Sequence, residues 1–340
     1  MRALLIVNSH ATSTTRLRRD VIVRALSSAV ELEVVQTRYR GHATSLAAAA
    51  RGDGFGLVLT LGGDGTVNEA VNGILGAATA GRHPTAGRHP TAAGESQTTA
   101  DGHVASGGPV AGPADLPALG ALPGGNANVF TRAVGLPADP VDAAGHILQA
   151  LSEGRYRSVG VGLAGDRYFT FNAGLGLDAE VVRAVDGRRA LGRTATPGLY
   201  VRMTLRQFYR VTDRRHPPLM LERAGHDPVG PLFLGAVSNT TPWTYLGRRP
   251  VHTNPEASFD CGLDVFALRS MRTISTLRVI RQMLSPARSL RGRSVLTLHD
   301  QAELTMRSAR PVAFQVDGEY MGEHECVRFV SVPNALRVIV

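Results

Sequence analysis

The sequence predicts an α/β domain with a parallel sheet, followed by a larger, mainly antiparallel, β-rich domain. Three observations carry this prediction. Short apolar runs alternate with helical patterns in the first third of the chain, two glycine-rich loops follow such runs, and short strand-like runs recur from about residue 158 onward. Strands that alternate with helices form parallel sheets, whereas closely spaced short strands form antiparallel ones.

The first third contains the strand and helix signals in strict alternation. Apolar runs of strand length are short enough to be buried parallel strands, and the segments between them place apolar residues at helical spacing. The predicted strands are 3–7, 32–35, 57–61 and 119–122, and the predicted helices are 16–29, 44–50, 66–75, a short one through 130–133, and 139–153 with Asp139 as its N-cap.

Residues 76–115 interrupt this alternation. The hexamer at 79–84 is repeated at 85–90, and the rest is rich in Gly, Ala, Pro, Ser and Thr. Such a composition cannot bury enough apolar surface to fold, so we expect a disordered insertion. The expected division is therefore an α/β domain over 1–135 that contains this insertion.

The second half is predicted to be a β-rich domain over 136–325. The expected strands are 158–162, 167–172, 231–237, 263–268, 295–298, 302–306 and 313–316, and the expected helices are 197–209 and 274–284. A last strand-like run covers 335–340, and a return of residues 326–340 to the first domain is one arrangement that the pattern leaves open.

The charge of the chain comes from arginine alone. The formal net charge is +9, and all 37 basic residues are arginines, because the sequence contains no lysine. A GC-rich coding bias and attraction to anionic partners both explain this excess, and net charge reports on association rather than on fold. One consequence is firm: a cation that contacts phosphate here must be arginine, histidine or a metal.

Cysteine usage and hydropathy indicate a cytoplasmic protein. Cys261 and Cys326 match no metal-binding spacing and no disulfide framework, and no run of about 18 apolar residues is present.

The strongest motif for function is Gly62-Gly63-Asp64-Gly65-Thr66, which follows a predicted buried strand and opens a helix. Glycines let the backbone approach a ligand, and free amides at a helix N-terminus attract anions. Thr66 is expected to cap the helix or to contact phosphate, and Asp64 to act through a metal or on a ribose. A purely structural turn is the alternative.

A second loop has the same design. Gly124, Gly125, Asn126 and Asn128 follow the strand at 119–122 and precede a short helix. Both loops are expected at the carboxyl ends of parallel strands, where ligands bind in α/β sheets. The two asparagines offer hydrogen bonds without negative charge, and structural capping is equally compatible with them.

A third motif holds two carboxylates. Asp317 and Glu319 flank Gly318 at the end of an apolar run. Asp-Gly is a strong hairpin-turn signal, and a placed carboxylate can also accept the proton of a hydroxyl nucleophile during phosphoryl transfer. Both interpretations remain open here.

Together these segments resemble the catalytic region of the diacylglycerol kinase family, which includes bacterial lipid kinases and sphingosine kinases. The resemblance rests on four motifs in the family's order, at 63–69, 122–128, 171–178 and 316–319. It implies a two-domain fold with the active site in the interdomain cleft, ATP bound by the first domain together with Mg²⁺, and an acceptor site in the second.

The resemblance also implies roles for individual residues. Asn8 and Thr37 would line the nucleotide site, and Gly63 to Glu69, including Asn68, would wrap the phosphates. Asn126 falls where the family often has threonine. Glu319 falls on the family's base, with Asp317 beside it.

The chain departs from the family pattern at three places. Residues 8–13 read Asn-Ser-His-Ala-Thr-Ser where the family has a glycine and a lysine, and Val129 replaces an aspartate. Cys261 replaces one acid of a segment that holds a structural Mg²⁺ in some members, so Asp260 and Asp264 are interpreted as polar residues at a strand edge.

The function expected from these observations is an ATP-dependent lipid kinase that phosphorylates the hydroxyl of a diacylglycerol-like lipid. A kinase for a soluble hydroxyl acceptor and a non-catalytic nucleotide-binding regulator are the alternatives. Nucleic-acid binding is not expected, because no recognised module is present.

Two arginine-rich segments are candidates for peripheral contact with an anionic membrane. Arg202, Arg206 and Arg210 recur every four residues among apolar side chains, with Arg214 and Arg215 following; the second segment holds Arg278, Arg281, Arg288, Arg291 and Arg293. A solvated helix face is the alternative for each.

Overall fold

The computed structural model describes residues 1–9, 15–76, 115–190, 197–211, 213–285 and 290–340. Residues 77–114 of the predicted insertion, which include the repeated hexamer, lie outside the described residues. Residues 10–14 and Arg288 of the second arginine segment also lie outside them.

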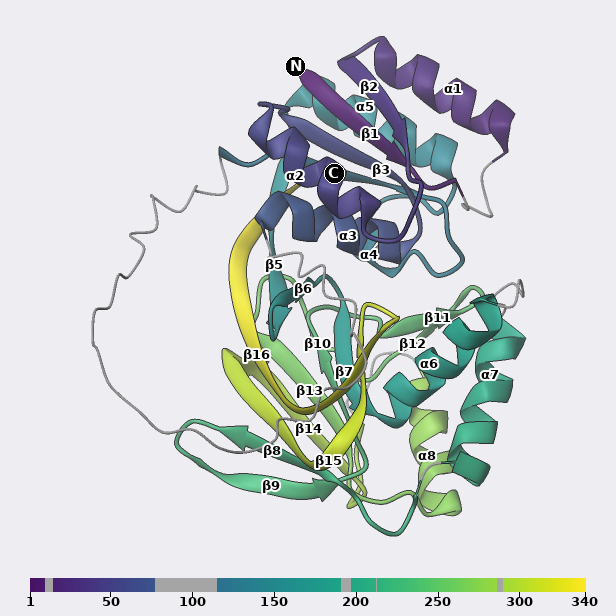
Figure 1. Ribbon diagram of the computed structural model, residues 1–340, viewed down its shortest axis with the longest axis vertical. Helices are drawn as coiled ribbons and strands as arrows, with labels where there is room; N and C mark the ends of the chain where they lie inside the picture. The colour runs from purple at the N-terminus through teal and green to yellow at the C-terminus, as the bar shows by residue number, and fades with distance from the viewer. Residues whose placement is uncertain (10–14, 77–114, 191–196, 212, 286–289) are drawn as a thin grey trace, which may run out of the picture.

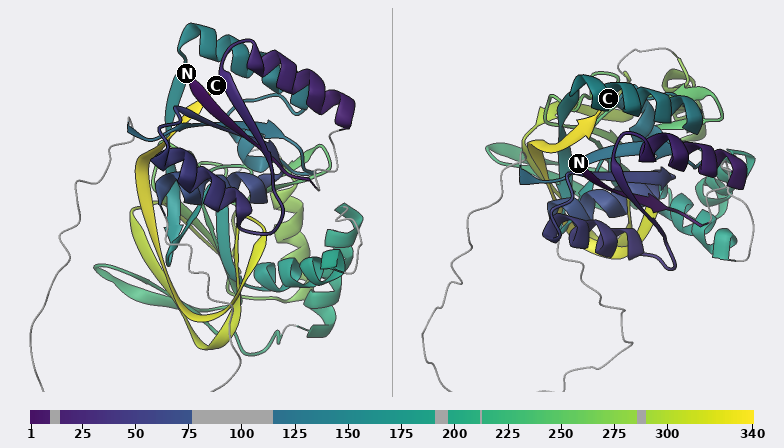
Figure 2. Two further views of the ribbon diagram at one scale, coloured as in Figure 1. Left: turned by 45° about the horizontal axis from the view of Figure 1, so that its top comes forward. Right: turned by 90° about the horizontal axis from the view of Figure 1, so that it is seen from above.

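The upper lobe in Figure 1 is an α/β unit on a parallel sheet with the strand order β4-β3-β1-β2. Helix α1 lies beside α5 and helix α2 beside α3, and these pairs cover the two faces of the sheet (Figure 2). The elements are β1 (Arg2–Val7), α1 (Arg16–Ser27), β2 (Glu31–Gln36), α2 (His42–Gly52), β3 (Leu57–Gly62), α3 (Asp64–Leu75), β4 (Ala118–Pro123), α4 (Val129–Ala133) and α5 (Pro140–Glu153).

The local sequence explains these elements. Every residue of β3 and β4 is buried, as expected for central strands covered on both faces. The carboxylate of Asp139 accepts hydrogen bonds from the amides of Val141 and Asp142, which confirms it as the N-cap of α5. Helix α3, however, begins at Asp64 rather than at Thr66, so Thr66 is not the cap; an acid in the first turn complements the helix dipole.

The lower lobe is mainly antiparallel, with the order β14-β13-β10-β7-β15-β16 and further strands attached to β15 and β16. Its elements are β5 (Tyr156–Ala164), β6 (Arg167–Phe169), β7 (Asn172–Gly176), α6 (Leu177–Ala190), α7 (Pro197–Arg206), the π-helical turn η2 (Gln207–Val211), β8 (Leu219–Arg223), β9 (His226–Leu232), β10 (Leu234–Ser238), β11 (Thr244–Leu246), β12 (Arg249–Val251), β13 (Leu263–Leu268), α8 (Thr273–Met283), β14 (Val295–Gln301), β15 (Glu303–Val316) and β16 (Glu319–Ile339). The predicted fold class, a parallel α/β unit followed by a β-rich one, is confirmed.

Strand β16 connects the two lobes. It begins at Glu319, pairs with β15 and then with β5, and ends parallel to β4 with Val338 opposite Leu119. Val338 and Ile339 are buried in the core of the upper lobe, and both chain termini lie there (Figures 1 and 2). One strand therefore fixes the position of the turn before Glu319 relative to the upper lobe.

Several elements differ from the prediction. Helix α6 was not predicted, since its apolar residues follow no clear helical stripe. The predicted strand 167–172 is split into β6 and β7, and the runs 302–306 and 313–316 merge into β15. The last run, 335–340, is the end of β16 rather than a separate strand.

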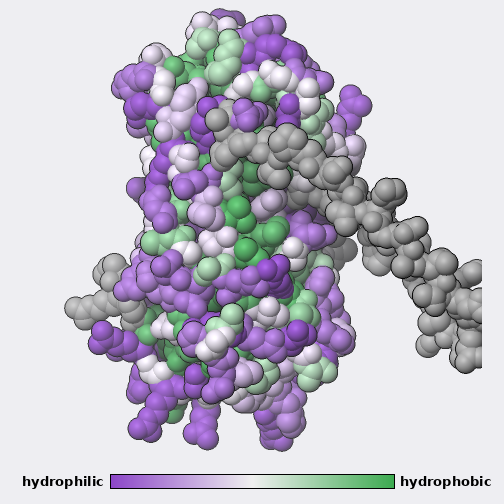
Figure 3. Space-filling view, turned by 90° about the vertical axis from the view of Figure 1, so that its left-hand side faces the viewer, coloured by the Kyte–Doolittle hydropathy of each residue, from purple (hydrophilic) through white to green (hydrophobic). Residues whose placement is uncertain are grey.

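The surface opposite α7 and α8 is mostly polar over the lower lobe, and its apolar side chains gather in a band near the middle of the molecule (Figure 3). Within the described residues, no helix combines the length and the apolar character that crossing a membrane requires.

Candidate functional site

Three loops meet at the carboxyl ends of β1, β3 and β4: the loop that begins at Asn8 and the two glycine loops. The side-chain amide of Asn8 donates to Oγ1 of Thr66 at 3.0 Å. The amide of Gly124 donates to the carbonyl of Gly62 at 2.7 Å. The two loops are thus joined backbone to backbone at adjacent strand ends, where a parallel sheet presents its ligand site.

Close approach of the two loops requires glycine. A Cβ atom on Gly124 would lie 2.8 Å from Cα of Gly62, and one on Gly125 would lie 2.7 Å from Cα of Gly63. Neither backbone atom can move aside as the end of a side chain can. The glycines therefore have a structural role as well as the predicted one of exposing amides to a ligand.

Asp64 connects the first glycine loop to helix α4. Its Oδ1 accepts a hydrogen bond from the amide of Phe130 at 3.1 Å, and so caps the N-terminal end of α4. Burial raises the pKa of Asp64 to about 6, partly opposed by the amides of Val129 and Phe130, and the charge of Asp317 raises it further. Among the residues that the structure describes, no basic side chain forms an ion pair with it.

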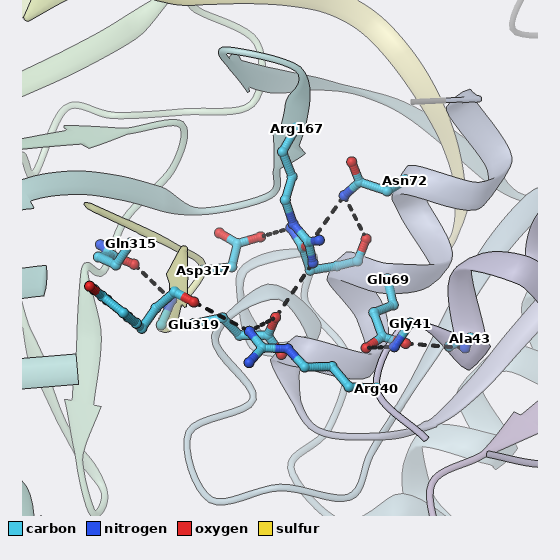
Figure 4. A network of polar contacts seen from close by, with 12 residues as sticks. Arg40, Gly41, Ala43, Glu69, Asn72, Arg167, Gln315, Asp317 and Glu319 are labelled. Atoms are coloured by element: carbon cyan, nitrogen blue, oxygen red, sulfur yellow. Dashed lines mark hydrogen bonds and ion pairs between the residues drawn. The ribbon is translucent and has the colours of Figure 1, made fainter. Parts of the chain in front are cut away.

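Glu319 comes from the lower lobe and lies against the first glycine loop. A Cβ atom on Gly65 would be only 2.5 Å from Oε1 of Glu319. Its other oxygen, Oε2, receives Nη2 of Arg40 at 3.1 Å and Nη2 of Arg167 at 3.4 Å. As Figure 4 shows, these two arginines come from different elements, the loop after β2 and strand β6. The predicted acid thus lies next to the predicted phosphate loop.

Asp317 is buried and accepts five hydrogen bonds. Its Oδ2 receives the side-chain amide of Asn68 at 2.8 Å, and the amide and hydroxyl of Thr170 at 2.7 and 2.8 Å. Its Oδ1 receives the amides of Phe171 at 3.0 Å and Asn172 at 3.1 Å. With both oxygens occupied in this way, Asp317 is suited to fixing the position of the β15–β16 turn rather than to accepting a substrate proton.

The turn between Asp317 and Glu319 is braced from behind by Gln315. Its Oε1 accepts the amide of Gly318 at 2.9 Å, and its Nε2 donates to the carboxylate of Asp178 at 2.8 Å. Burial raises the pKa of Asp178 to about 6. Asp317 and Gly318 both have positive φ, 46° and 75°, so the predicted Asp-Gly hairpin turn is present and carries the acids.

Asn68 points toward the lower lobe rather than toward the glycine loops. Its amide donates to Asp317 and to the carbonyl of Tyr168, and its oxygen accepts Nη2 of Arg167 at 2.7 Å. One turn later, Asn72 exchanges two hydrogen bonds with the backbone of Tyr168, at 2.9 and 3.0 Å. Helix α3 is therefore fastened to strand β6 across the two lobes.

Glu69 faces helix α2. Its carboxylate accepts the amides of Gly41 at 2.7 Å and Ala43 at 3.1 Å, at the start of that helix. Burial raises its pKa, and the amide of Gly41 opposes this. With both oxygens bound to backbone, Glu69 positions the loop that carries Arg40 (Figure 4).

The remaining predicted residues occupy the edge of the site. Thr37 follows β2, where its amide donates to the carbonyl of Val7 at 2.9 Å and its carbonyl accepts from Ser9. Asn126 is exposed at the tip of the second glycine loop. Asn128 instead closes that loop on itself, since its side chain bonds both the amide and the carbonyl of Gly125.

Arg132 and Tyr245 form a second contact between the lobes. The guanidinium of Arg132, on α4, lies 3.3 Å from the ring centroid of Tyr245, on β11. Burial raises the pKa of Tyr245, and the charge of Asp64 raises it as well. The β11–β12 hairpin thus reaches the surroundings of Asp64.

The acids near Cys261 are satisfied by protein groups. Oδ2 of Asp260 pairs with Arg157 at 2.7 Å, and Oδ1 of Asp264 accepts Nδ1 of His299 at 2.8 Å and the amide of Asp300 at 3.0 Å. Asp264 was predicted to be a polar residue at a strand edge, but it is buried within β13, which is paired with β10 on one side and β14 on the other.

Sequence reasoning missed Arg40, Arg167 and Asn72. The absence of lysine was the available signal, because it required the cations near a phosphate site to be arginines. It did not indicate which of the 37 they are.

Comparison with known proteins finds similar sequences that are named as lipid kinases. Residues 2–162 match the diacylglycerol kinase catalytic domain family. A "Probable lipid kinase YegS-like" protein of Chromohalobacter salexigens is 26% identical, over 98% of this chain and 91% of that protein. The diacylglycerol kinase of Staphylococcus carnosus is 23% identical, over 91% of this chain and 84% of that protein.

Solved structures agree on the fold. A crystal structure from Bacillus anthracis str. Sterne aligns with a TM-score of 0.70 at 21% identity, covering 99% of this chain and 96% of that one. The second, of a diacylglycerol kinase from the same strain, has a TM-score of 0.63 at 18% identity over the same shares. Residues 2–162 of the chain therefore match the diacylglycerol kinase catalytic domain family, and the relatives that it resembles are named as kinases.

Proposed function

We propose that the protein transfers the γ-phosphate of ATP to the hydroxyl of a diacylglycerol-like lipid. The observation that carries this proposal is the position of Glu319, which lies against Gly65 although the two residues belong to different lobes. A carboxylate beside a glycine-rich helix N-terminus combines a proton acceptor with an anion site, as phosphoryl transfer to a hydroxyl requires. The names of the relatives support the lipid as acceptor.

The nucleotide would bind at the ends of β1, β3 and β4. Backbone amides of Gly62 to Thr66 and of Gly124 and Gly125 would hold the phosphates, with Asn8, Thr37 and Asn126 at the edge of the site. Arg40 and Arg167 are the nearby cations, and in this lysine-free chain they would take the part that lysine has in many phosphate sites.

The residues present fit a magnesium ion bound together with ATP. Asp64 is a hard oxygen ligand beside the phosphate loop; burial raises its pKa, and a bound cation would stabilise its ionised form. Asp64 would hold the ion, which would neutralise charge on the phosphate oxygens when bound.

Glu319 would act as the general base. Its Oε2 is held by the two arginines, whereas Oε1 is directed at Gly65 and thus at the phosphate loop. Oε1 would accept the proton of the acceptor hydroxyl as the hydroxyl oxygen attacks the γ-phosphorus, while the bond to the bridging oxygen breaks and ADP leaves. Asp317 would keep the turn in place, and Asn68 and Asn72 would hold the lobes at the distance that the transfer needs.

A labelling experiment tests this proposal. The protein is incubated with γ-labelled ATP and a total lipid extract, and the labelled species are identified. We expect a phosphorylated lipid, and no labelled lipid from Asp64→Ala. The matched control is Asp142→Ala, which removes an exposed acid from the first turn of α5 in the same lobe and should leave activity unchanged.

Three outcomes would each overturn a part of the proposal. Normal turnover by a folded Asp64→Ala variant would refute the assignment of the nucleotide site. Label that enters only soluble alcohols would refute the lipid acceptor, and ATP binding without any labelled product would refute catalysis. We further propose a cytoplasmic protein that visits an anionic membrane peripherally to reach its acceptor.

A further inference from the structure

One face of the lower lobe combines arginines with exposed apolar side chains. It is formed by α7, η2, the loop after η2, and α8, on the right of the lower lobe in Figure 1. We call it the α7–α8 face. Its apolar members are Leu205, Tyr209, Ile274, Leu277 and Ile280, and its basic members are Arg202, Arg206, Arg214, Arg215, Arg269, Arg272, Arg278 and Arg281.

Two adjoining hollows connect α7 with the start of α8. Tyr209 lines an open hollow of about 560 Å³ together with Arg202 and Arg206 of α7. It also lines a second hollow of about 620 Å³, which extends to Arg272 and Thr273 at the start of α8. Segments some 70 residues apart in the sequence therefore adjoin in the fold.

Helix α8 carries large apolar side chains on the side that faces solvent. It buries Thr276 and Val279 against the lobe, yet it leaves Ile274 exposed by 77% and Leu277 by 57%. At 100° per residue, Ile274, Leu277 and Arg281 project within the same outward arc. Exposing large aliphatic side chains to water is unfavourable, so their position on this helix indicates a surface that a binding partner covers.

The charge of the face identifies what covers it. Asp213 is the one acid among the described residues that line the two hollows, and it is occupied by the amide of Arg215 and the ring of His216. Within the described chain, the arginines of the face form no ion pairs with acids. Arginines elsewhere do so, as Arg18 does with Asp139.

We propose that the α7–α8 face docks on an anionic lipid bilayer, with Ile274, Leu277 and Tyr209 entering the interface and the arginines contacting the headgroups. An apolar stripe between basic residues is the pattern of helices that lie in a membrane interface. A nucleic acid would use the arginines for phosphate contacts, but those contacts would not bury the row of exposed aliphatic side chains. The purpose of this docking, access to a lipid acceptor, rests on the proposed function, whereas its test, vesicle binding, does not.

Direct contacts link this face to the candidate site. The end of α8 accepts hydrogen bonds from the β12 strand and the residue after it: Arg249 donates to the carbonyl of Leu284 at 2.7 Å, and the amide of His252 to that of Met283 at 2.9 Å. Strand β12 pairs with β11, whose Tyr245 contacts Arg132 near Asp64. A bilayer on this face would therefore lie on the side of the molecule that carries the β11–β12 hairpin.

The test compares binding of the full chain to phosphatidylcholine vesicles with and without phosphatidylglycerol, by cosedimentation. The docking variant is Ile274→Glu with Leu277→Glu. The matched control is Leu17→Glu with Val21→Glu on α1, an arginine-rich helix of the other lobe whose aliphatic side chains are 75% and 48% exposed. We expect the docking variant to bind phosphatidylglycerol vesicles at least about tenfold more weakly and the control to bind normally.

A second variant examines the charge. Arg278→Gln with Arg281→Gln should weaken the dependence of binding on phosphatidylglycerol and on salt, because it removes charges next to the aliphatic stripe. Circular dichroism spectra check that each variant is folded. Unchanged vesicle binding by both folded variants would overturn the proposal, as would tight binding to duplex DNA by a chain that leaves vesicles unbound.

Activity on an acceptor that needs no bilayer separates this inference from the kinase proposal. With a short-chain diacylglycerol dissolved as monomers, the docking variant should turn over like the wild type. Vesicle binding that depends on Ile274 and Leu277 without phosphorylation of any lipid would support docking and refute the kinase. Turnover of the dissolved lipid, together with vesicle binding that is unaffected by replacing Ile274 and Leu277, would support the kinase and refute docking by this face.

Discussion

Asp317 and Glu319 are only two residues apart, and the structure predicts opposite consequences when each is replaced by its amide. Asp317→Asn should lower stability, whereas Glu319→Gln should lower turnover. The sequence leaves either acid available as the base, so this pair of substitutions tests the division of roles directly.

The cost of Asp317→Asn can be worked from its hydrogen bonds. Oδ2 accepts three and Oδ1 accepts two, and all five donors are N–H or O–H groups. Whichever way an asparagine is oriented, its amide group faces at least two donors. Two lost bonds to a charged acceptor at roughly 1.5–3 kcal/mol each give about 3–6 kcal/mol.

Burial offsets part of this cost. It raises the pKa of Asp317, so the neutral amide avoids some of the penalty of an ionised group in the interior. We therefore expect the lower end of the range, about 3 kcal/mol less free energy of unfolding. The Asp317→Asn molecules that remain folded still carry Glu319, so their kcat should stay close to that of the wild type.

Glu319→Gln should behave in the opposite way. Arg40 is largely exposed, at 62%, and exposed ion pairs contribute at most about 1 kcal/mol. Loss of a general base lowers turnover by about 100- to 10,000-fold. The matched control is Glu323→Gln, an acid farther along β16 that pairs with Arg183 at 2.8 Å and should leave kcat unchanged.

Urea unfolding and initial rates with saturating ATP measure both quantities for each variant. The reasoning is refuted if Glu319→Gln retains a kcat within tenfold of the wild type. It is also refuted if Asp317→Asn is as stable as the wild type while its kcat falls to the level of Glu319→Gln, because Asp317 would then be the base.

Two further predictions concern Arg167 and Asp178. Arg167→Gln removes the link between Asn68 and Glu319, so kcat/KM should fall about 10- to 100-fold. The control Arg157→Gln breaks an exposed ion pair on β5 and should leave kcat/KM unchanged. Equal kinetics for the two variants would contradict this role of Arg167. Asp178→Asn should raise the free energy of unfolding at pH 7 by about 3 kcal/mol, because the folded-state pKa of about 6 exceeds the ordinary 3.8 and burying the charge is costly. The gain should be complete above pH 6 and vanish as the pH falls toward 3.8, which denaturation across that range would measure; a pH-independent difference would exclude titration of Asp178 as its cause.

Local signals in the sequence determined the framework of the upper lobe and the motifs of the site. Buried strands such as β3 and the Asp-Gly turn at Asp317 depend on neighbouring residues, so periodicity and turn chemistry predict them. The glycine loops belong to the same class, because the close approach of their backbones requires glycine.

The tertiary structure alone decided which side chains meet. Arg40 reaches Glu319 across 279 positions of sequence, and Asn68 reaches Asp317 across 249. Such contacts depend on how β16 spans both lobes, which no local pattern encodes. The same holds for the α7–α8 face, where two segments that each resemble a solvated helix become one basic and apolar surface because the fold places Tyr209 beside the start of α8.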